Sequence, residues 1–294
     1  MTLSQALTAA TTRGLERLDA QWLLLYALGR PTQGRAWLLT HDTDTLTAAE
    51  QDAFDAALQR RCKGEPLAYI TGTREFFGLP LQVDARVLDP RPDTETLVEW
   101  ALEVLPLSTG PSSVYPELVE GPHHILDLGT GSGAIALALK HTHPELHVSA
   151  VDASPDALDV ARTNALALKL KVEFIQSHWL QNVSGKFQLI VSNPPYIAAA
   201  DPHLPALHHE PLQALASGKD GLDDIRQIIT QASAHLYPGG WLLLEHGYDQ
   251  ATEVRALLTS AGFARVQSRR DLNGIERCSG GEWSTIQASN RQAN

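Results

Sequence analysis

Two short segments of the chain contain residues whose types and order could carry chemistry. They read DLGTGSG at residues 127–133 and NPPY at residues 193–196. Each directly follows a run of aliphatic residues that predicts a buried strand. Because ligands of parallel sheets bind at the carboxyl ends of the strands, we expect both segments to contribute to one site.

The segment 127–133 has the composition of a loop that binds a nucleotide. Its glycines permit a tight turn and let a ligand approach the backbone closely. Asp152 ends the next aliphatic run, about 20 residues after the glycines, a spacing that suits an acid receiving two ribose hydroxyls. We therefore expect this region to hold the nucleoside part of a cofactor.

The residue before the glycines bears on which cofactor this is. Gly129, Gly131 and Ala134 also satisfy the G-x-G-x-x-A pattern of dinucleotide-binding proteins, which would suit a nicotinamide enzyme. A carboxylate at Asp127 instead suits the positively charged amino end of S-adenosylmethionine and would repel a pyrophosphate. We expect S-adenosylmethionine, while a purely structural role of Asp127 as a cap of the loop stays open.

The segment 193–196 suits an acceptor nitrogen. Two consecutive prolines cannot donate ladder hydrogen bonds, so the preceding strand must stop and carbonyl groups become free to face a ligand. An amide nitrogen is a poor nucleophile because its lone pair is delocalised. If the Asn193 side-chain oxygen and the Pro194 carbonyl accept its two N–H bonds, the lone pair can face a methyl donor. Tyr196 would offer a ring face to the flat acceptor; an ordinary strand-terminating turn is the structural alternative.

The N-terminal part predicts a small helical bundle. Helical periodicity runs through residues 1–63, and no strand pattern interrupts it. We expect one of these helices to place five residues on the same face, namely Leu18, Trp22, Leu23, Tyr26 and Ala27. Residues 76–83 then predict a short hairpin. We expect a helical substrate-binding domain at residues 1–73 and a hairpin linker at residues 74–89.

The rest of the chain, residues 90–294, predicts an α/β domain. From residue 124 onward, aliphatic runs typical of strands alternate with helical patterns, which indicates a mainly parallel, doubly wound, Rossmann-like sheet. Residues 106–122 are rich in Pro, Ser and Gly, and this composition predicts a flexible surface insertion.

Composition argues against several classes of protein. The chain has 294 residues with 23 Lys+Arg against 34 Asp+Glu, a formal net charge of -11, so direct nucleic-acid binding is not expected. Cys62 and Cys278 lack the spacing of a disulfide framework or a zinc site. The histidine pair in residues 208–210 resembles a metal cluster, but adjacent histidines rarely converge on one ion, so we expect no metal. Residues 22–28 are too short a stretch to span a bilayer and follow no basic segment, so we expect a cytoplasmic monomer.

Further segments, together with these two, resemble the release-factor glutamine methyltransferase family, also called PrmC or HemK. The matching stretches, which cover nearly the whole chain, are GEPLAYITG at 64–72, PRPDTE at 90–95, DLGTGSGAIALAL at 127–139, SNPPYI at 192–197, LEHG at 244–247, and Asp271 with Gly274 and Arg277. NPPY alone is shared with adenine-N6 and other amino methyltransferases, whereas its combination with the segment 91–95 is much more specific.

The resemblance implies a helical domain that helps to hold a protein substrate and a seven-stranded methyltransferase domain. The implied reaction is N5-methylation of the glutamine in the Gly-Gly-Gln motif of peptide chain release factors, with S-adenosylmethionine as methyl donor. The residues implied to bind the cofactor are Asp127, Gly129, Thr130, Gly131, Ser132, Gly133, Asp152, Trp179 near the adenine, and Asn193. The residues implied to bind the glutamine are Asn193, Pro194, Pro195, Tyr196, Arg91 and Glu95. Among these, Asn193, Pro194 and Tyr196 are the expected catalytic residues.

This chain departs from the family pattern in three places. His178 precedes Trp179 where the family usually has an aspartate, and a histidine accepts from an adenine amino group only through an unprotonated nitrogen. The insertion at 106–122 is longer than usual. The tail from Cys278 differs from the usual ending, which leaves the last strand open.

Other interpretations also stay open. An adenine-N6 methyltransferase would need a basic groove, which the net charge does not indicate. The paralogous ribosomal-protein glutamine methyltransferase shares NPPY, but the segment 91–95 favours the release-factor branch. A binding module that kept the fold and lost turnover is the non-enzymatic alternative. Glu245 could act as a base, but because the methylated amide can lose its proton to water, we expect a structural role.

Overall fold

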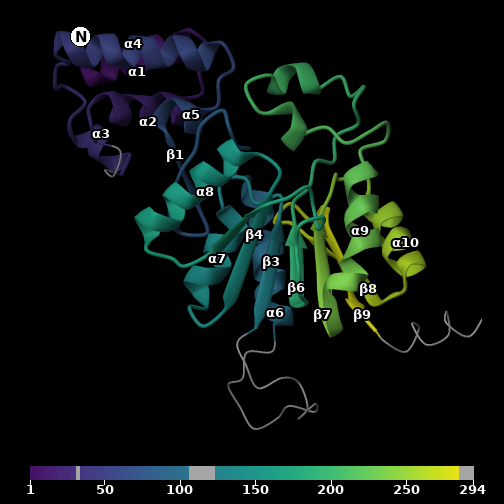
Figure 1. The fold of residues 1–294 in the computed structure, drawn as a ribbon. Coiled ribbons are helices and arrows are strands. Elements are labelled where there is room, and N and C mark those ends of the chain that lie inside the picture. Colours follow the sequence, from purple (N-terminus) through teal and green to yellow (C-terminus); the bar gives the residue numbers. More distant parts are fainter. Residues whose placement is uncertain (31–33, 106–122, 285–294) are drawn as a thin grey trace, which may run out of the picture. The chain divides into compact units, whose positions relative to one another are not determined.

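A computed structural model describes residues 1–30, 34–105 and 123–284 (Figure 1). The chain divides into two compact units, one of Met1–Thr73 with Val83–Ala85, the other of Arg74–Gln82 with the described residues from Arg86 onward. The insertion expected at 106–122 lies outside the described residues. Among the residues described, no helix is long and apolar enough to cross a membrane.

The first unit consists of helices, as predicted. Their bounds are α1 Leu3–Thr12, α2 Arg17–Ala27, α3 Ala36–Thr40, α4 Ala48–Cys62 and α5 Leu67–Thr71. α1 and α4 each begin with a capping box, in which Thr2 or Thr47 accepts a hydrogen bond from the backbone three residues further on. These caps satisfy N–H groups that a helix start leaves unpaired. A core of leucine and alanine side chains around Phe54 holds the helices together.

The face predicted for α2 is partly wrong. Leu18 and Tyr26 are exposed, whereas Ala20, Leu23 and Leu24 are fully buried. The helix contains so many apolar residues that its sequence is compatible with more than one buried face. Packing against α1 and α4 selects the face that contains Ala20 and Leu24.

The predicted hairpin is present as β1 (Thr73–Phe76) and β2 (Leu79–Gln82). Its two turn residues, Phe77 and Gly78, have φ angles of 50° and 77°, the left-handed values that tight two-residue hairpin turns require. Asn164 on α8 (Pro155–Leu168) binds the end of β2. Its Oδ1 accepts from the Gln82 N–H at 2.7 Å, and its Nδ2 donates to the Gln82 carbonyl at 3.0 Å. The second strand of the hairpin is therefore attached to the sheet domain.

The second unit is built on a seven-stranded sheet, which confirms the predicted α/β fold (Figure 1). The strands in chain order are β3 His124–Leu128, β4 His147–Asp152, β5 Glu173–Gln176, β6 Phe187–Ser192, β7 Leu236–Glu245, β8 Phe263–Arg270 and β9 Glu276–Trp283. Their spatial order is β5-β4-β3-β6-β7-β9-β8. The first five strands run parallel, and β9 lies antiparallel between β7 and β8.

Helices cover the sheet on both faces, which explains why its central strands have continuous apolar sequences. α9 (Asp223–His235) and α10 (Ala251–Ala261) share a core with Leu126, Ile190 and Leu242. α6 (Glu95–Val104) packs on β6, β7 and β9, where the buried Trp100 lies beside Trp241 of β7, with ring centroids 6.2 Å apart. α7 (Ala134–Thr142) and α8 pack along β3, β4 and β5. Strands buried on two faces need apolar residues at successive positions.

This topology brings four distant segments of the chain to one edge of the sheet. β3 leads into the glycine loop, β4 ends in Asp152, β6 leads into the segment 193–196, and β7 ends in Glu245. After β3, the next strands β4 and β5 are added toward one edge of the sheet, whereas β6 and β7 are added toward the other edge. The boundary between β3 and β6 is therefore the topological switch point, where open parallel sheets bind ligands.

Candidate active site

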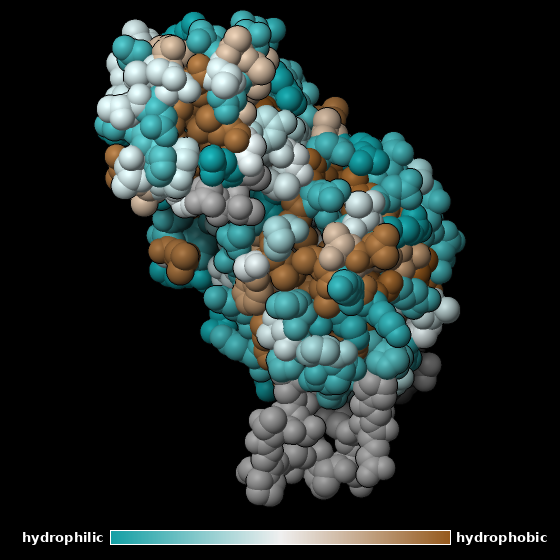
Figure 2. Space-filling model, turned by 90° about the vertical axis from the view of Figure 1, so that its left-hand side faces the viewer, coloured by the Kyte–Doolittle hydropathy of each residue, from teal (hydrophilic) through white to brown (hydrophobic). Residues whose placement is uncertain are grey.

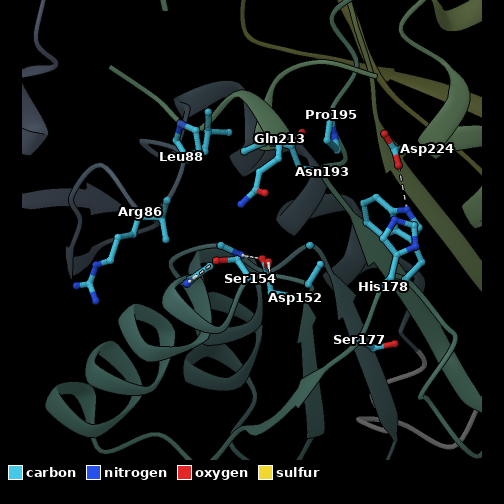
Figure 3. A pocket seen from close by; sticks show the side chains of 18 residues that line it. Arg86, Leu88, Asp152, Ser154, Ser177, His178, Asn193, Pro195, Gln213 and Asp224 are labelled. Carbon is cyan, nitrogen blue, oxygen red and sulfur yellow. Dashed lines mark hydrogen bonds between the residues drawn. The ribbon is translucent and has the colours of Figure 1, made fainter. Parts of the chain in front are cut away.

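A cavity of about 320 Å³ lies at the carboxyl ends of the central strands (Figure 3). Residues that line it include Gly129, Gly131, Asp152, Trp179, Asn193 and Asp224. In Figure 3, Asp152 and Ser154 lie on one side of the cavity and Asn193 and Asp224 on others. The structure thus brings together residues of both segments that the sequence singled out.

The glycine loop is held to the end of β4 by its own backbone. The N–H groups of Gly129 and Thr130 both donate to the Val151 carbonyl at 2.8 Å. The N–H of Gly131 donates to Asp152 Oδ2 at 2.9 Å, and the N–H of Ser154 donates to Asp152 Oδ1 at 2.9 Å. Burial raises the pKa of Asp152, and these donors act against that effect. The carboxylate is therefore fixed at the cavity wall.

Two glycines of the loop are needed for different physical reasons. A Cβ on Gly129 would lie 3.3 Å from the Trp179 indole, so this position cannot take a side chain without displacing the ring. Gly131 has open space around it, but its φ of 54° lies in the left-handed region that glycine adopts without penalty. Among the predicted loop residues, only these two line the cavity, and Thr130, Ser132 and Gly133 lie behind them.

Asp127 is fully buried beneath the loop and does not line the cavity. Its Oδ2 accepts from the Thr130 hydroxyl at 2.6 Å and from the Ala136 N–H at 3.1 Å. Its Oδ1 has no hydrogen-bond partner among the described residues. Burial raises the pKa of this carboxyl to about 7. This geometry is that of a residue that caps the loop, the structural role considered for Asp127 from the sequence. A contact of Asp127 with the cofactor stays a prediction.

Trp179 closes another side of the cavity, and the structure adds Asp224 beside it. The indole Nε1 donates to Asp224 Oδ1 at 3.0 Å, while the Asp224 N–H donates to the Ser217 hydroxyl at 2.8 Å. His178 also lines the cavity, and its Nδ1 lies 3.4 Å from the Gln227 side chain. Sequence reasoning missed Asp224, because only the fold brings the start of α9 beside Trp179.

A second pocket, of about 160 Å³, adjoins the cavity. Asn193, Leu88 and Ala214 line both spaces, whereas Tyr196 and Arg91 line only the pocket. Pro195 lines the cavity, and the buried Pro194 lines neither. Asn193 therefore stands at the junction between the two spaces.

The segment 193–196 is fixed by a neighbouring loop. The Tyr196 carbonyl accepts from the Gln250 side chain at 3.0 Å, and the Ile197 N–H donates to the Leu215 carbonyl at 2.9 Å. Gly221 passes so near that a Cβ there would lie 2.2 Å from the Tyr196 carbonyl oxygen. These contacts hold the backbone of the segment in one conformation.

Arg91 and Glu95, which the sequence assigned together, lie in different environments. Arg91 Nη2 donates to the buried Glu210 Oε1 at 2.6 Å, and its Nη1 lies 3.7 Å from Asp89 Oδ2. Glu95 accepts from the Phe77 N–H at 3.0 Å and lines neither space. Glu210, considered in sequence as a metal ligand, has its carboxylate bound to Arg91. No group of residues that could hold a metal ion occurs in the described part of the chain.

Two further contacts lie behind the segment 193–196. The Asn193 Nδ2 donates to the Thr94 hydroxyl oxygen at 3.2 Å, and the Tyr196 hydroxyl donates to Glu245 Oε1 at 3.3 Å. Burial raises the pKa of Tyr196, so its hydroxyl stays protonated. Neither Thr94 nor a contact of Glu245 with this segment was expected from the sequence.

Comparisons with known proteins identify relatives of the chain. The family model described as "PrmC N-terminal domain" matches residues 2–72, and the one described as "Methyltransferase small domain" matches residues 114–219. The release factor glutamine methyltransferase of Xylella fastidiosa is 46% identical to the chain over 276 residues, which cover 92% of the chain and 95% of that relative. The chain belongs to the release factor glutamine methyltransferase family. The family member of Pseudomonas aeruginosa is 47% identical over 271 residues, which cover 91% of the chain and 92% of the relative.

The family relationship inferred from the motifs is thus confirmed, and solved structures agree on the fold. A methyltransferase from Pyrococcus furiosus superposes with a TM-score of 0.52 at 17% identity, covering 78% of the chain and 99% of that protein. At this level of identity the likeness shows the fold alone. The release factor glutamine methyltransferase family is therefore assigned by the sequence relatives.

Proposed function

We propose that this protein transfers a methyl group from S-adenosylmethionine to the side-chain amide nitrogen of a glutamine in a peptide chain release factor. The observation that carries the proposal is the position of Asn193 at the junction of the cavity and the pocket. Because its Nδ2 donates to Thr94, its Oδ1 is the side-chain atom available to an acceptor amide. The names of relatives at 46% and 47% identity support the substrate.

The cavity residues fit S-adenosylmethionine. Each oxygen of Asp152 accepts one backbone N–H and keeps a lone pair for a ribose hydroxyl. Trp179 offers a flat apolar surface to the adenine, with Asp224 at its edge. When ionised, Asp127, whose Oδ1 has no hydrogen-bond partner among the described residues, would place negative charge behind the glycine loop, which suits a cationic amino group. When bound there, the cofactor supplies a methyl group carried on positively charged sulfur.

The pocket residues fit a flat, neutral amide. Asn193 Oδ1 would accept one N–H of the acceptor amide. The Pro194 carbonyl, which accepts no hydrogen bond from the described residues, would accept the other. Holding both N–H bonds fixes the nitrogen, so that its lone pair can face the methyl donor. Positioning of this kind can lower a barrier by several kcal/mol without a strong base.

The surroundings of the pocket suit a protein as the carrier of that amide. A more open hollow of about 600 Å³ shares Leu207 and Leu215 with the pocket and is otherwise lined by residues such as Pro202, Leu204 and Leu212. Figure 2 shows that hydrophobic residues also gather on one side of the second unit, among hydrophilic ones. Apolar surface next to a reaction site is typical of sites that bind another protein.

The test is methyl transfer from labelled S-adenosylmethionine to a purified release factor. The parallel samples are the same factor with the glutamine of its Gly-Gly-Gln motif changed to alanine, an unrelated protein, and duplex DNA. We expect label on the wild-type factor alone. Label on DNA would favour an adenine-directed enzyme, and cofactor binding without label on any sample would favour a binding module.

A further inference from the structure

Two segments that match the family, 91–95 and 244–247, each contain a residue that has no role in the proposed reaction so far. They lie far apart in the sequence, at the start of α6 and at the end of β7. In the fold, one residue of each of these segments forms a hydrogen bond with a side chain of the segment 193–196 without lining the cavity or the pocket. These residues are Thr94 and Glu245, which are 4% and 1% exposed.

The four side chains form a connected set of hydrogen bonds. Asn193 Nδ2 donates to Thr94 Oγ1 at 3.2 Å, and the Tyr196 hydroxyl donates to Glu245 Oε1 at 3.3 Å. The Thr94 hydroxyl also lies close to the Glu245 carboxylate and acts to lower the pKa of this carboxyl. Glu245 is thus linked to Tyr196 directly and to Asn193 through Thr94.

The donor and acceptor types of these four side chains determine in which direction each hydrogen bond between them is donated. Burial raises the pKa of Glu245 to about 7, and the Thr94 and Tyr196 hydroxyls act against this rise. Above that pH the ionised carboxylate can only accept hydrogen bonds, so both hydroxyl protons point toward Glu245. The oxygen of Thr94 then presents its lone pairs to the Asn193 amide, which must turn its NH₂ group inward. The Asn193 Oδ1 is consequently left facing the cavity and pocket. If the amide turned over, an N–H group would meet the N–H groups of the acceptor, which is repulsive.

The buried charge of Glu245 has a nearby counter-charge. Arg277 acts on it electrostatically, and the Arg277 Nε lies 3.3 Å from Asp271 and 3.8 Å from Asp93. The Oε2 of Glu245 has no hydrogen-bond partner among the described residues. A buried carboxylate with one bare oxygen is costly for stability. Its presence behind the acceptor site therefore points to a functional reason.

We propose that Thr94 and Glu245 are positioning residues, which fix the orientation of the Asn193 amide and of the Tyr196 ring. This inference rests on the proposed function, because it concerns how the acceptor amide is held. Thr94 and Glu245 touch neither the cofactor cavity nor the pocket. They act through Asn193 and Tyr196.

The test uses Thr94→Val, which keeps the branched shape and removes the hydroxyl, together with Thr94→Ser, which restores it. Glu245→Gln is the second probe. The amide of the new glutamine can donate a hydrogen bond to Thr94, which would disturb the orientation of the hydrogen bonds among these side chains. The matched control is Ser149→Ala. Ser149 is also buried and also donates to a carboxylate, Glu173 Oε2 at 2.9 Å, but it lies in β4 away from the pocket.

We expect Thr94→Val to lower kcat/KM for the release factor roughly three- to tenfold, the effect of one hydrogen bond. The affinity for S-adenosylmethionine, measured by calorimetry, should stay within about twofold of wild type. Thr94→Ser should recover most of the activity, Glu245→Gln should lower kcat/KM as well, and Ser149→Ala should behave as wild type.

Three results would overturn the inference. Unchanged kinetics of Thr94→Val, with an active wild type, would show that Asn193 needs no partner. Equal losses in Thr94→Val and Thr94→Ser, with a lower Tm in both, would show a merely structural role. A fall in cofactor affinity that accounts for the whole loss would place the effect at the cofactor. An inactive wild-type protein would instead refute the proposed function, and this inference with it.

Discussion

The substitution Asp127→Asn tests whether the buried carboxylate beneath the glycine loop is held at a cost to stability. An asparagine keeps the shape, and its oxygen can still accept from Thr130 and Ala136. Burial raises the pKa of Asp127 from 3.8 to about 7. Because the folded-state pKa lies above the unfolded-state pKa, the folded protein holds the extra proton between these two values. The stability that this proton contributes is present at low pH and is lost as the pH rises toward 7.

The size of the effect follows from that difference in pKa. A rise from 3.8 to about 7 corresponds to roughly 4 kcal/mol of unfolding free energy above pH 7. The new NH₂ group would occupy the position of Oδ1, which has no partner, and an unpaired buried donor costs about 1–3 kcal/mol. The net expectation at about pH 8 is a gain of roughly 1–3 kcal/mol, or about 3–9 °C in Tm.

The assay is thermal unfolding without cofactor at about pH 8 and about pH 5, followed by circular dichroism. We expect Asp127→Asn to be more stable than wild type at the higher pH only. Other carboxyl groups titrate equally in both proteins, so the difference between them isolates Asp127. The exposed Asp223→Asn is the control and should change Tm little at either pH. A variant less stable than wild type by the same amount at both pH values would refute the reasoning.

The same variant also separates the two roles considered for Asp127. If its charge favours the cationic amino end of the cofactor, calorimetry should show S-adenosylmethionine affinity reduced by about tenfold. Unchanged affinity would assign Asp127 to capping of the loop alone.

Substitutions at three further residues test other parts of the site. Gly129→Ala should weaken S-adenosylmethionine binding about tenfold in calorimetry, because the new methyl group meets Trp179 at 3.3 Å; equal affinity would contradict the tight approach. Asp224→Asn should weaken cofactor binding by a smaller factor, since an amide can still accept from the indole, and Asp224→Ala should weaken it more. Glu210→Ala should lower the free energy of unfolding, measured in urea, by about 3 kcal/mol, because it removes the buried carboxylate that pairs with Arg91. A loss below about 1 kcal/mol would show that this ion pair is replaceable.

The parts of the fold that could be predicted from the sequence are those specified by local pattern. The apolar runs before residues 129 and 193 predict strands because buried parallel strands need apolar residues on both faces. The positions of Asp152, Asn193 and Tyr196 follow, since each stands at the end of such a run. Helix α8 begins at Pro155, a residue type that favours the first position of a helix.

The parts that could not be predicted depend on contacts between distant segments. Thr94 and Asp224 stand in ordinary local contexts, and only the strand order and the packing of loops bring them to the site. The last strand was left open because the tail from Cys278, which includes Gly280 and Gly281, differs from the family's usual ending. In the fold they lie within a strand, where a Cβ on Gly280 would lie 2.5 Å from the Leu243 side chain. The sequence of α2 likewise permits two buried faces, and its partners decide between them.

The measurement that tests the central claim most directly is tandem mass spectrometry of the release factor after reaction with this protein. It compares wild-type enzyme with Asn193→Ala, whose ability to bind S-adenosylmethionine is checked separately. We expect one added methyl group, located on the side chain of the glutamine in the Gly-Gly-Gln peptide, and its loss with Asn193→Ala. A methyl group on any other residue, or an unchanged yield with the variant, would contradict the role of Asn193 in holding the acceptor amide.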